Sequence, residues 1–298
     1  MIVADRLGVP MAQVRFVQSD TAAVPRGGGT GGSRSLQLAG SSVLVAADTV
    51  MARAREVVAT ALEADPGDIT AVDGGVGVAG VPDRVLTWRD VAAAARGQEV
   101  SLSEARDESQ PGATYPFGAH VSVVEVDLDT GRVTPVRHVA VDDCGTVLNP
   151  VLVAGQQHGG LAQGISQALW EGFGYDTEGN PTSGSFAAYI LPTAAELPSY
   201  EAASTETRTP YNPLGAKGIG EAATIGSTPA VQNAVVDALA PLGVRHVDMP
   251  LTPDRVWRTV RDAEAGTLAD PWREPPAFFA TLPVRGASAD PEAASVDV

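Results

Sequence analysis

Residues 120–141 read HVSVVEVDLDTGRVTPVRHVAV, and this stretch carries the clearest fold signal in the chain. Its two arms alternate apolar and polar residues or run β-branched, which is typical of strands with one buried face. Residues 129–131, Asp-Thr-Gly, supply a turn between the arms. The stretch therefore predicts an antiparallel β-hairpin in the middle of the chain.

Helical patterns flank this hairpin on both sides. Apolar residues recur at helical spacing between Val43 and Leu62, which predicts a long amphipathic helix. Thr87 and Thr252 each precede a short helical pattern as N-caps. Helices are predicted at residues 2–8, 43–62, 87–97, 157–170, 222–239 and 251–263. Strands are predicted at residues 14–20 and 184–192, with a second hairpin at residues 69–80.

The helix predicted near 157–170 contains Gly159, Gly160 and Gly164. Glycine is costly inside a helix, so we expect another element to pack closely against these positions. Residues 98–116 are polar and weakly patterned, which indicates a connecting loop. Strands and helices mix without an internal repeat, so the predicted fold class is α+β, with mixed sheets and packed helices.

Composition restricts the classes of function. The chain has 298 residues, 44% of them hydrophobic, which is enough for a sizeable core in one or two domains. The formal net charge of -16 argues against binding to nucleic acid or to an anionic membrane. The single cysteine, Cys144, excludes an internal disulfide and any multi-cysteine metal site. The sequence shows neither a long apolar run nor a signal-peptide pattern, so we expect a cytoplasmic protein.

Two glycine-rich segments could bind a ligand. Residues 27–35 bring several glycines ahead of a helix, where backbone N–H groups can hold anionic oxygens. The segment matches no phosphate-binding motif, and a structural loop explains it equally well. Residues 215–221, GAKGIGE, place Glu221 just before a predicted helix and contain Lys217, the only lysine. A helix N-terminus favours an ionised carboxylate, so Glu221 is either a helix-terminal acid or a base facing a ligand.

Two further segments contain polar side chains. Residues 142–150 read DDCGTVLNP, and Cys144 there has no histidine at a recognisable offset, so a buried thiol is the simplest interpretation. Residues 155–160 read GQQHGG. His158 has no second histidine at metal-binding spacing and is better explained as a packed or capping residue. The amide of Gln156 can recognise a planar heterocycle.

Taken in order, these segments resemble the molybdenum-binding subunit of the xanthine dehydrogenase, aldehyde oxidase and carbon monoxide dehydrogenase family. The matching segments are GGGTGGSRSLQLAGSSV, VDDCGTVLNPVLVAGQQHGGLAQGISQALWEG, GSFAAYILP and TRTPYNPLGAKGIGEAATIGSTPAVQNAVVDAL. The resemblance runs from residue 2 to about residue 262 and corresponds to the C-terminal portion of that longer subunit. It implies two cofactor-binding subdomains, residues 1–110 and 111–263. Residues 264–298 are rich in proline, alanine and acid, and we expect a partly disordered tail.

The resemblance also implies a role for individual residues. Glu221 corresponds to the catalytic general base. The implied cofactor is molybdopterin with molybdenum, in its cytosine dinucleotide form, with no metal ligand from the chain itself. The implied cofactor contacts are Gly31, Gly32, Ser33, Arg34, Ser35, Asp143, Cys144, Thr146, Asn149, Gln156, Lys217 and Gly218.

The resemblance implies oxidative hydroxylation of an aldehyde, an N-heterocycle or carbon monoxide, with a water-derived oxygen. Iron–sulfur clusters and FAD on partner subunits would take the electrons, and a complementary N-terminal half would complete the subunit. The alternative is a non-catalytic remnant or assembly module that keeps the fold without metal. The residues do not select one substrate among the three classes.

Overall fold

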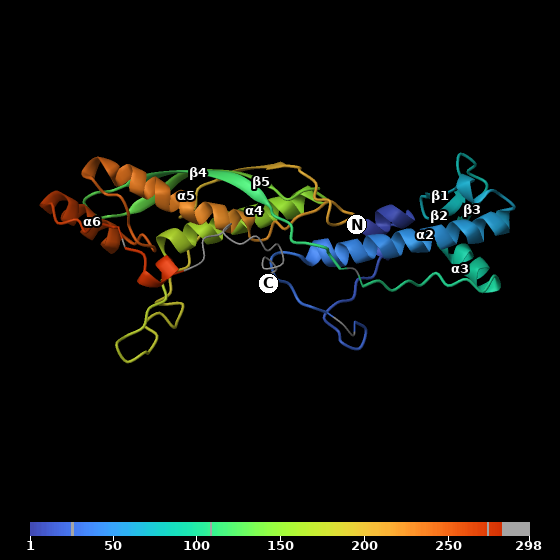
Figure 1. Ribbon diagram of the computed structural model, residues 1–298. Coiled ribbons are helices and arrows are strands. Elements are labelled where there is room, and N and C mark those ends of the chain that lie inside the picture. Colours follow the sequence, from blue (N-terminus) through green and yellow to red (C-terminus); the bar gives the residue numbers. More distant parts are fainter. Residues whose placement is uncertain (25–26, 108, 273, 282–298) are drawn as a thin grey trace.

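Two lobes, each with its own sheet and helices, lie end to end in the computed structural model of the chain (Figure 1). The structure describes residues 1–24, 27–107, 109–272 and 274–281. No helix within these ranges is long and apolar enough to cross a membrane. Residues 282–298 of the predicted tail lie outside the described residues.

The first lobe is built on the long helix α2 (Ser41–Leu62), which confirms the predicted amphipathic helix. Its small antiparallel sheet has the order β1-β2-β3, and Val58, Val76 and Val91 are fully buried between sheet and helices. The predicted hairpin at residues 69–80 is therefore confirmed as β1 and β2. The other elements are α1 (Ile2–Leu7), β1 (Ile69–Val72), β2 (Gly75–Val78), β3 (Val85–Thr87) and α3 (Trp88–Gly97).

The second lobe contains the hairpin that residues 120–141 predict. Strands β4 (Phe117–Val126) and β5 (Val133–Asp143) pair antiparallel, and β6 (Tyr200–Thr205) adds to β5 in parallel. Helices α4 (Pro150–Leu169), α5 (Ala222–Leu239) and α6 (Pro253–Ala265) complete the lobe. A mixed sheet with packed helices confirms the α+β fold class. Short helical turns occur at Met11–Gln13, Leu36–Gly40, Pro66–Asp68, Ala240–Leu242 and Ala277–Thr281.

Glycines on α4 let α5 approach it closely. A Cβ atom at Gly160 would lie 2.8 Å from the Cβ of Ala223, and one at Gly164 would overlap Ser227. The carbonyl oxygen of Gly160 accepts a hydrogen bond from Thr224 Oγ1 at 3.0 Å. The expectation of close packing is confirmed at these two glycines, whereas Gly159 faces open space. This contact places the start of α5 beside the middle of α4.

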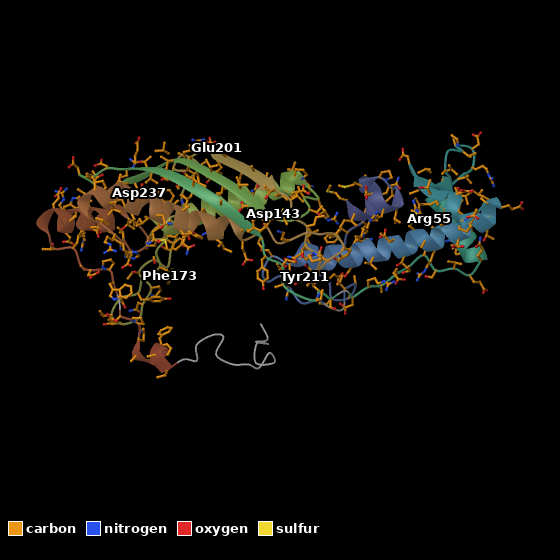
Figure 2. The ribbon with its side chains drawn as sticks, turned by 45° about the horizontal axis from the view of Figure 1, so that its top comes forward. Arg55, Asp143, Phe173, Glu201, Tyr211 and Asp237 are labelled. Atoms are coloured by element: carbon orange, nitrogen blue, oxygen red, sulfur yellow. The ribbon has the colours of Figure 1, made fainter. Side chains whose placement is uncertain are left out.

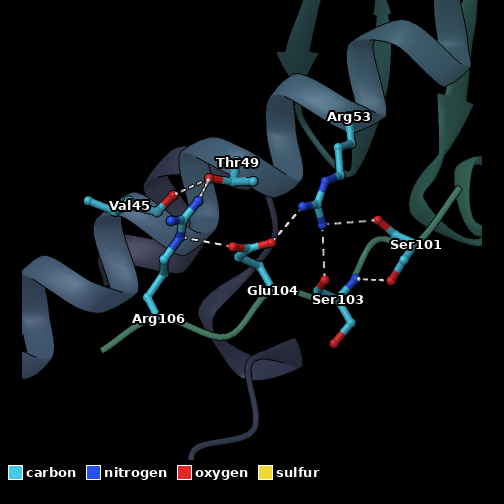
Figure 3. Close-up of polar contacts among 7 residues, drawn as sticks. All are labelled: Val45, Thr49, Arg53, Ser101, Ser103, Glu104 and Arg106. Carbon is cyan, nitrogen blue, oxygen red and sulfur yellow. Dashed lines mark hydrogen bonds and ion pairs between the residues drawn. The ribbon is translucent and has the colours of Figure 1, made fainter. Parts of the chain in front are cut away.

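The segment after α3 is held along α2 by side-chain contacts (Figure 3). Arg53 on α2 donates to the carbonyl oxygens of Ser101 and Ser103 and forms an ion pair of 2.7 Å with Glu104. Arg106 bonds the other carboxylate oxygen of Glu104 at 2.8 Å. Side chains with fixed partners therefore attach this connecting loop to the first lobe before it enters β4.

Three details of the predicted elements are wrong. Residues 14–20 and 184–192 form no strand, and the apolar Phe16 and Phe186 are exposed there rather than buried in a sheet. Helix α4 begins at Pro150, seven residues earlier than predicted. The reason is a complete helix start, with Pro150 in the first turn and the Asn149 side chain accepting from the N–H groups of Val151 and Leu152.

Candidate functional site

Glu221 lies immediately before α5, and its side chain is exposed. Its Oε2 accepts a hydrogen bond of 2.8 Å from Ser33 Oγ, which joins two loops 188 residues apart. Within the described part of the chain, the Glu221 side chain makes no capping bond to α5. The hydrogen bond that orients this side chain thus comes from the first lobe and not from the helix that Glu221 precedes.

Two glycines allow the loops to come together. A Cβ atom at Gly218 would lie 2.8 Å from the Cβ of Ser33, and one at Gly220 would lie 2.9 Å from Ser33 Oγ. Real Cβ atoms do not approach this closely without displacement of the neighbour. The two glycines that precede Glu221 are therefore required for the contact between residues 31–35 and residues 218–221.

An open pocket of about 420 Å³ lies between these loops and α4. Several predicted cofactor contacts and Glu221 line it together, although they come from distant parts of the sequence. We call Gly31, Gly32, Ser33, Ser35, Gln156, Ile219, Gly220 and Glu221 the pocket wall. The pocket is lined by Thr30, Gly31, Gly32, Ser33, Ser35, Leu36, Gln156, Lys217, Ile219, Gly220 and Glu221.

The backbone of residues 31–33 is open toward this pocket. Gly32 and Ser33 both have left-handed φ angles, 60° and 54°. A Cβ atom at Gly31 or Gly32 would meet no heavy atom within 4 Å. The side chain of Arg34 is exposed, and this residue is absent from the pocket lining.

At the edge of the pocket, Lys217 forms a buried ion pair with Asp143. Lys217 Nζ lies 2.9 Å from Asp143 Oδ1, and the two side chains are 6% and 0% exposed. Burial alone would raise the pKa of the Asp143 carboxyl, but hydrogen bonds from Lys217 and from the Gly145 backbone outweigh it and hold that pKa well below its usual range. Figure 2 shows Asp143 at the end of the sheet that faces the first lobe.

The neighbouring Asp142 points to the other face of β5, where no site residue was predicted. Its Oδ1 lies 3.1 Å from His120 Nε2, and its Oδ2 accepts from Gln157 Nε2 at 3.1 Å. His120 Nδ1 lies 3.4 Å from Nε2 of the fully buried His138. Burial lowers the pKa of His138 to about 4, and the nearby His120 adds to this effect. We call Asp142, Asp143, Lys217, His120, His138 and Gln157 the buried network.

A signal for part of this network was present in the sequence. His120, His138 and Asp142 fall on the inward positions of the two alternating arms, where an apolar residue is usual. The spacing alone does not show that these residues meet, because strand register is needed to place His138 diagonally from His120.

The remaining predicted contacts lie on the loop between β5 and α4. Cys144 is buried, which raises the pKa of its thiol, and its carbonyl oxygen accepts from the Lys217 backbone N–H at 2.7 Å. Thr146 Oγ1 is buried without a hydrogen-bond partner in the described part of the chain. Asn149 Oδ1 caps α4 and its amide nitrogen donates to Met1 Sδ at 3.1 Å, so one N–H of the amide is left for a ligand.

No group of three or more His, Cys, Asp or Glu side chains that could hold a metal occurs in the ranges that the structure describes. The side chains and backbone that the chain itself contributes to the pocket include one carboxylate, hydroxyl and amide groups, and open backbone at Gly31 and Gly32. These groups can orient a polar ligand and move a proton.

Comparison with known proteins identifies relatives of the chain. The family model described as "Molybdopterin cofactor-binding domain" matches residues 1–198. The carbon monoxide dehydrogenase large chain of Hydrogenophaga pseudoflava is 38% identical over 266 residues, 88% of this chain and 33% of the relative. The nicotine 6-hydroxylase large subunit of Paenarthrobacter nicotinovorans is 35% identical over 270 residues, 87% of this chain and 33% of the relative.

A solved structure of Cu,Mo-CO dehydrogenase in its carbon monoxide reduced state has the same fold. Its TM-score is 0.80 at 36% identity, over 90% of this chain and 34% of the solved chain. The present chain thus spans about a third of the length of the relatives it matches.

Proposed function

The chain belongs to the molybdopterin cofactor-binding domain family, and from this premise we propose that it is part of the catalytic subunit of a molybdenum hydroxylase. The observation that carries the proposal is the pocket in which Glu221 meets the glycine loop and Gln156. The proposed reaction is oxidative hydroxylation of an aldehyde, an N-heterocycle or carbon monoxide.

The residues of the pocket fit a large polar cofactor. Gly31 and Gly32 leave space above their backbone, and Thr146 Oγ1 is a buried hydroxyl with no partner in the described residues. Backbone N–H groups can hold anionic oxygens although the chain carries a net charge of -16. Gln156, with its paired amide donor and acceptor, suits the pterin ring.

The proposed contacts divide between the two ends of the cofactor. Residues 31–35, Gln156 and Gly218 would hold the molybdopterin end. Cys144, Thr146 and the amide nitrogen of Asn149 would line the cytosine dinucleotide end. When bound, the cofactor supplies the metal centre that accepts two electrons and activates the oxygen that water donates.

Glu221 acts as the general base in this proposal. Its Oε2 accepts from Ser33 Oγ, so Oε1 is the oxygen that accepts a proton during turnover. The hydroxyl of Ser33 orients the carboxylate toward the pocket that both residues line. A positioned base of this kind contributes about 10²–10⁴-fold to a rate. Each oxygen inserted releases two electrons and two protons, and we assign the electrons to iron–sulfur and flavin partner subunits.

Exposed apolar side chains support a larger assembly. The proposed partner is the remaining part of a longer subunit, because the chain spans about a third of its relatives. Examples are Phe16, Tyr115, Val151, Leu152, Phe186 and Ile225.

The division into subdomains 1–110 and 111–263 also belongs to this proposal. Two separate hydrophobic cores support it, one around Val58 and Val76 and one around Ile165 and Val235. The glutamate loop joins them, since Leu214 on that loop packs with Leu44 of α2.

The proposal is tested by metal and nucleotide analysis of the chain purified with its partner subunits. We expect one molybdenum and one cytosine nucleotide per chain. A folded complex without molybdenum would contradict the proposal and favour a non-catalytic protein that keeps only the fold.

A further inference from the structure

We propose that Asp143 and Lys217 form a positioning pair that holds the Glu221 loop in place, and that the Lys217 ammonium does not bind an anionic group of the cofactor. This inference rests on the proposed function, because it concerns how that site is built. Neither composition nor spacing indicates the pair, since 74 positions separate the two residues.

The Lys217 ammonium already has an anionic partner within the chain, the carboxylate of Asp143. Its Nζ lies 2.9 Å from Asp143 Oδ1 and 4.4 Å from the centre of the Phe117 ring. Lys217 contributes to the pocket lining, but its side chain is only 6% exposed and its ammonium is paired with Asp143. A buried ammonium that is neutralised by a carboxylate has little attraction left for a second anion.

The partners of Asp143 are also complete. Its carboxylate accepts from the Gly145 backbone N–H at 2.9 Å and from Thr205 Oγ1 at 3.0 Å, in addition to Lys217. These donors come from the loop after β5 and from β6. A carboxylate bonded in this way is anchored to the sheet, and it fixes the Lys217 side chain that it binds.

Backbone bonds extend this anchor along the glutamate loop. The Lys217 N–H donates to the Cys144 carbonyl at 2.7 Å, and the Thr146 N–H donates to the Gly215 carbonyl at 3.0 Å. The side chain of Asn212 holds Ala216 on both sides, donating to its carbonyl and accepting from its N–H. The loop is therefore fixed up to Lys217, four residues before Glu221.

Beyond Lys217, the fixed part of the loop gives way to residues 218–220, which contain two glycines. The ion pair is thus the last side-chain anchor before the general base. A shift at Lys217 would move Glu221 relative to Ser33 without breaking the first lobe. Loss of the pair should consequently reduce the rate per bound cofactor, beyond any effect on stability.

The test is a double-mutant cycle in the complex with its partner subunits, using Lys217→Met, Asp143→Asn and the double variant. Each single change leaves one charge buried without a partner, whereas the double variant leaves neither. Asparagine at 143 keeps an oxygen that accepts from the Gly145 N–H, and its amide nitrogen can donate to the Thr205 hydroxyl, which accepts instead of donating. The readouts are the melting temperature, the molybdenum content and kcat per bound molybdenum.

We expect each single variant to lower the melting temperature by roughly 5–10 °C and kcat per molybdenum by about 10-fold. In the double variant, most of the melting temperature and most of kcat per molybdenum should be recovered, and molybdenum should be retained. The matched control is the exposed pair Arg137 and Glu201 on the same sheet, whose side chains are 57% and 54% exposed. In the double-mutant cycle of this exposed pair, the melting-temperature coupling should be at most about 2 °C.

Three results would overturn the inference. If Lys217→Met and the double variant lose molybdenum while Asp143→Asn keeps it, Lys217 is a cofactor contact. Unchanged kcat per molybdenum in the single variants would make the pair structural only. If the coupling between the two melting-temperature changes is no larger than for Arg137 and Glu201, Asp143 and Lys217 do not stabilise the fold as a pair. The melting-temperature cycle does not need the cofactor, so a complex without molybdenum would refute the proposed function separately.

Discussion

The carboxylates of the pocket wall and of the buried network differ in exposure and in hydrogen bonding. Glu221 is exposed and accepts one hydrogen bond, from Ser33, among the described residues. Asp143 is fully buried and bonded to Lys217, Gly145 and Thr205. A lightly bonded carboxylate can gain and lose a proton during turnover, whereas a fully bonded one stays ionised and fixes its neighbours. The comparison separates the residue that would do chemistry from those that hold it.

The largest expected effect is on the pocket wall. Glu221→Gln keeps the size and polarity of the side chain but removes the base, so kcat should fall by about 10²–10⁴-fold. Molybdenum content and melting temperature should stay at wild-type values, since the carboxylate supports no core contact. The matched control, Glu178→Gln at an exposed turn, should leave all three unchanged. Near-normal turnover in Glu221→Gln would remove Glu221 from the mechanism.

A smaller effect is expected in the buried network, and it concerns stability. The folded pKa of His138 is about 4 against 6.5 for the free side chain, so the unfolded chain binds the proton first as pH falls. Stability should therefore drop by about 3 kcal/mol between pH 6.5 and pH 4, and His138→Gln should lose this slope. Denaturant unfolding across that range measures it. Equal slopes in both proteins would show that His138 is not buried as a neutral ring.

The smallest effect tests the contact between the two lobes. Removing the Ser33 hydroxyl should lower kcat by about 10-fold, the equivalent of one hydrogen bond to a charged group. Ser33→Ala keeps the unfavourable positive φ of 54°, and Ser33→Gly relieves it. Similar losses in both variants would assign the effect to the hydroxyl. A loss in Ser33→Ala alone would assign it to backbone strain and would weaken the comparison.

Local patterns in the sequence predicted most of the elements. The hairpin at 120–141, the amphipathic helix before Leu62 and the caps at Thr87 and Thr252 all depend on neighbours within a few residues. The glycines of α4 were correctly expected to meet a close neighbour at Gly160 and Gly164, because a missing side chain inside a helix needs a packing reason.

Long-range pairing could not be predicted in the same way. Strand β6, Tyr200–Thr205, was missed because its Glu-Ala-Ala sequence has weak strand propensity, and parallel pairing with β5 creates it. Residues 14–20 have strand-like composition yet pair with no strand in the described ranges. The partners of Lys217 and Glu221 also lie far away in sequence, so their environments required the fold.

The central claim is that a cofactor lies against the open backbone of residues 31–35, and two alanine substitutions test it most directly. Gly31 and Gly28 belong to the same loop, avoid positive φ, and would each place a Cβ in open space. Only Gly31 lines the pocket. In the purified complex, Gly31→Ala should contain at least about 10-fold less molybdenum than the wild type, because the methyl group takes the space of the ligand. Its melting temperature should be unchanged. Gly28→Ala should remain loaded. Full molybdenum content in Gly31→Ala would contradict the account.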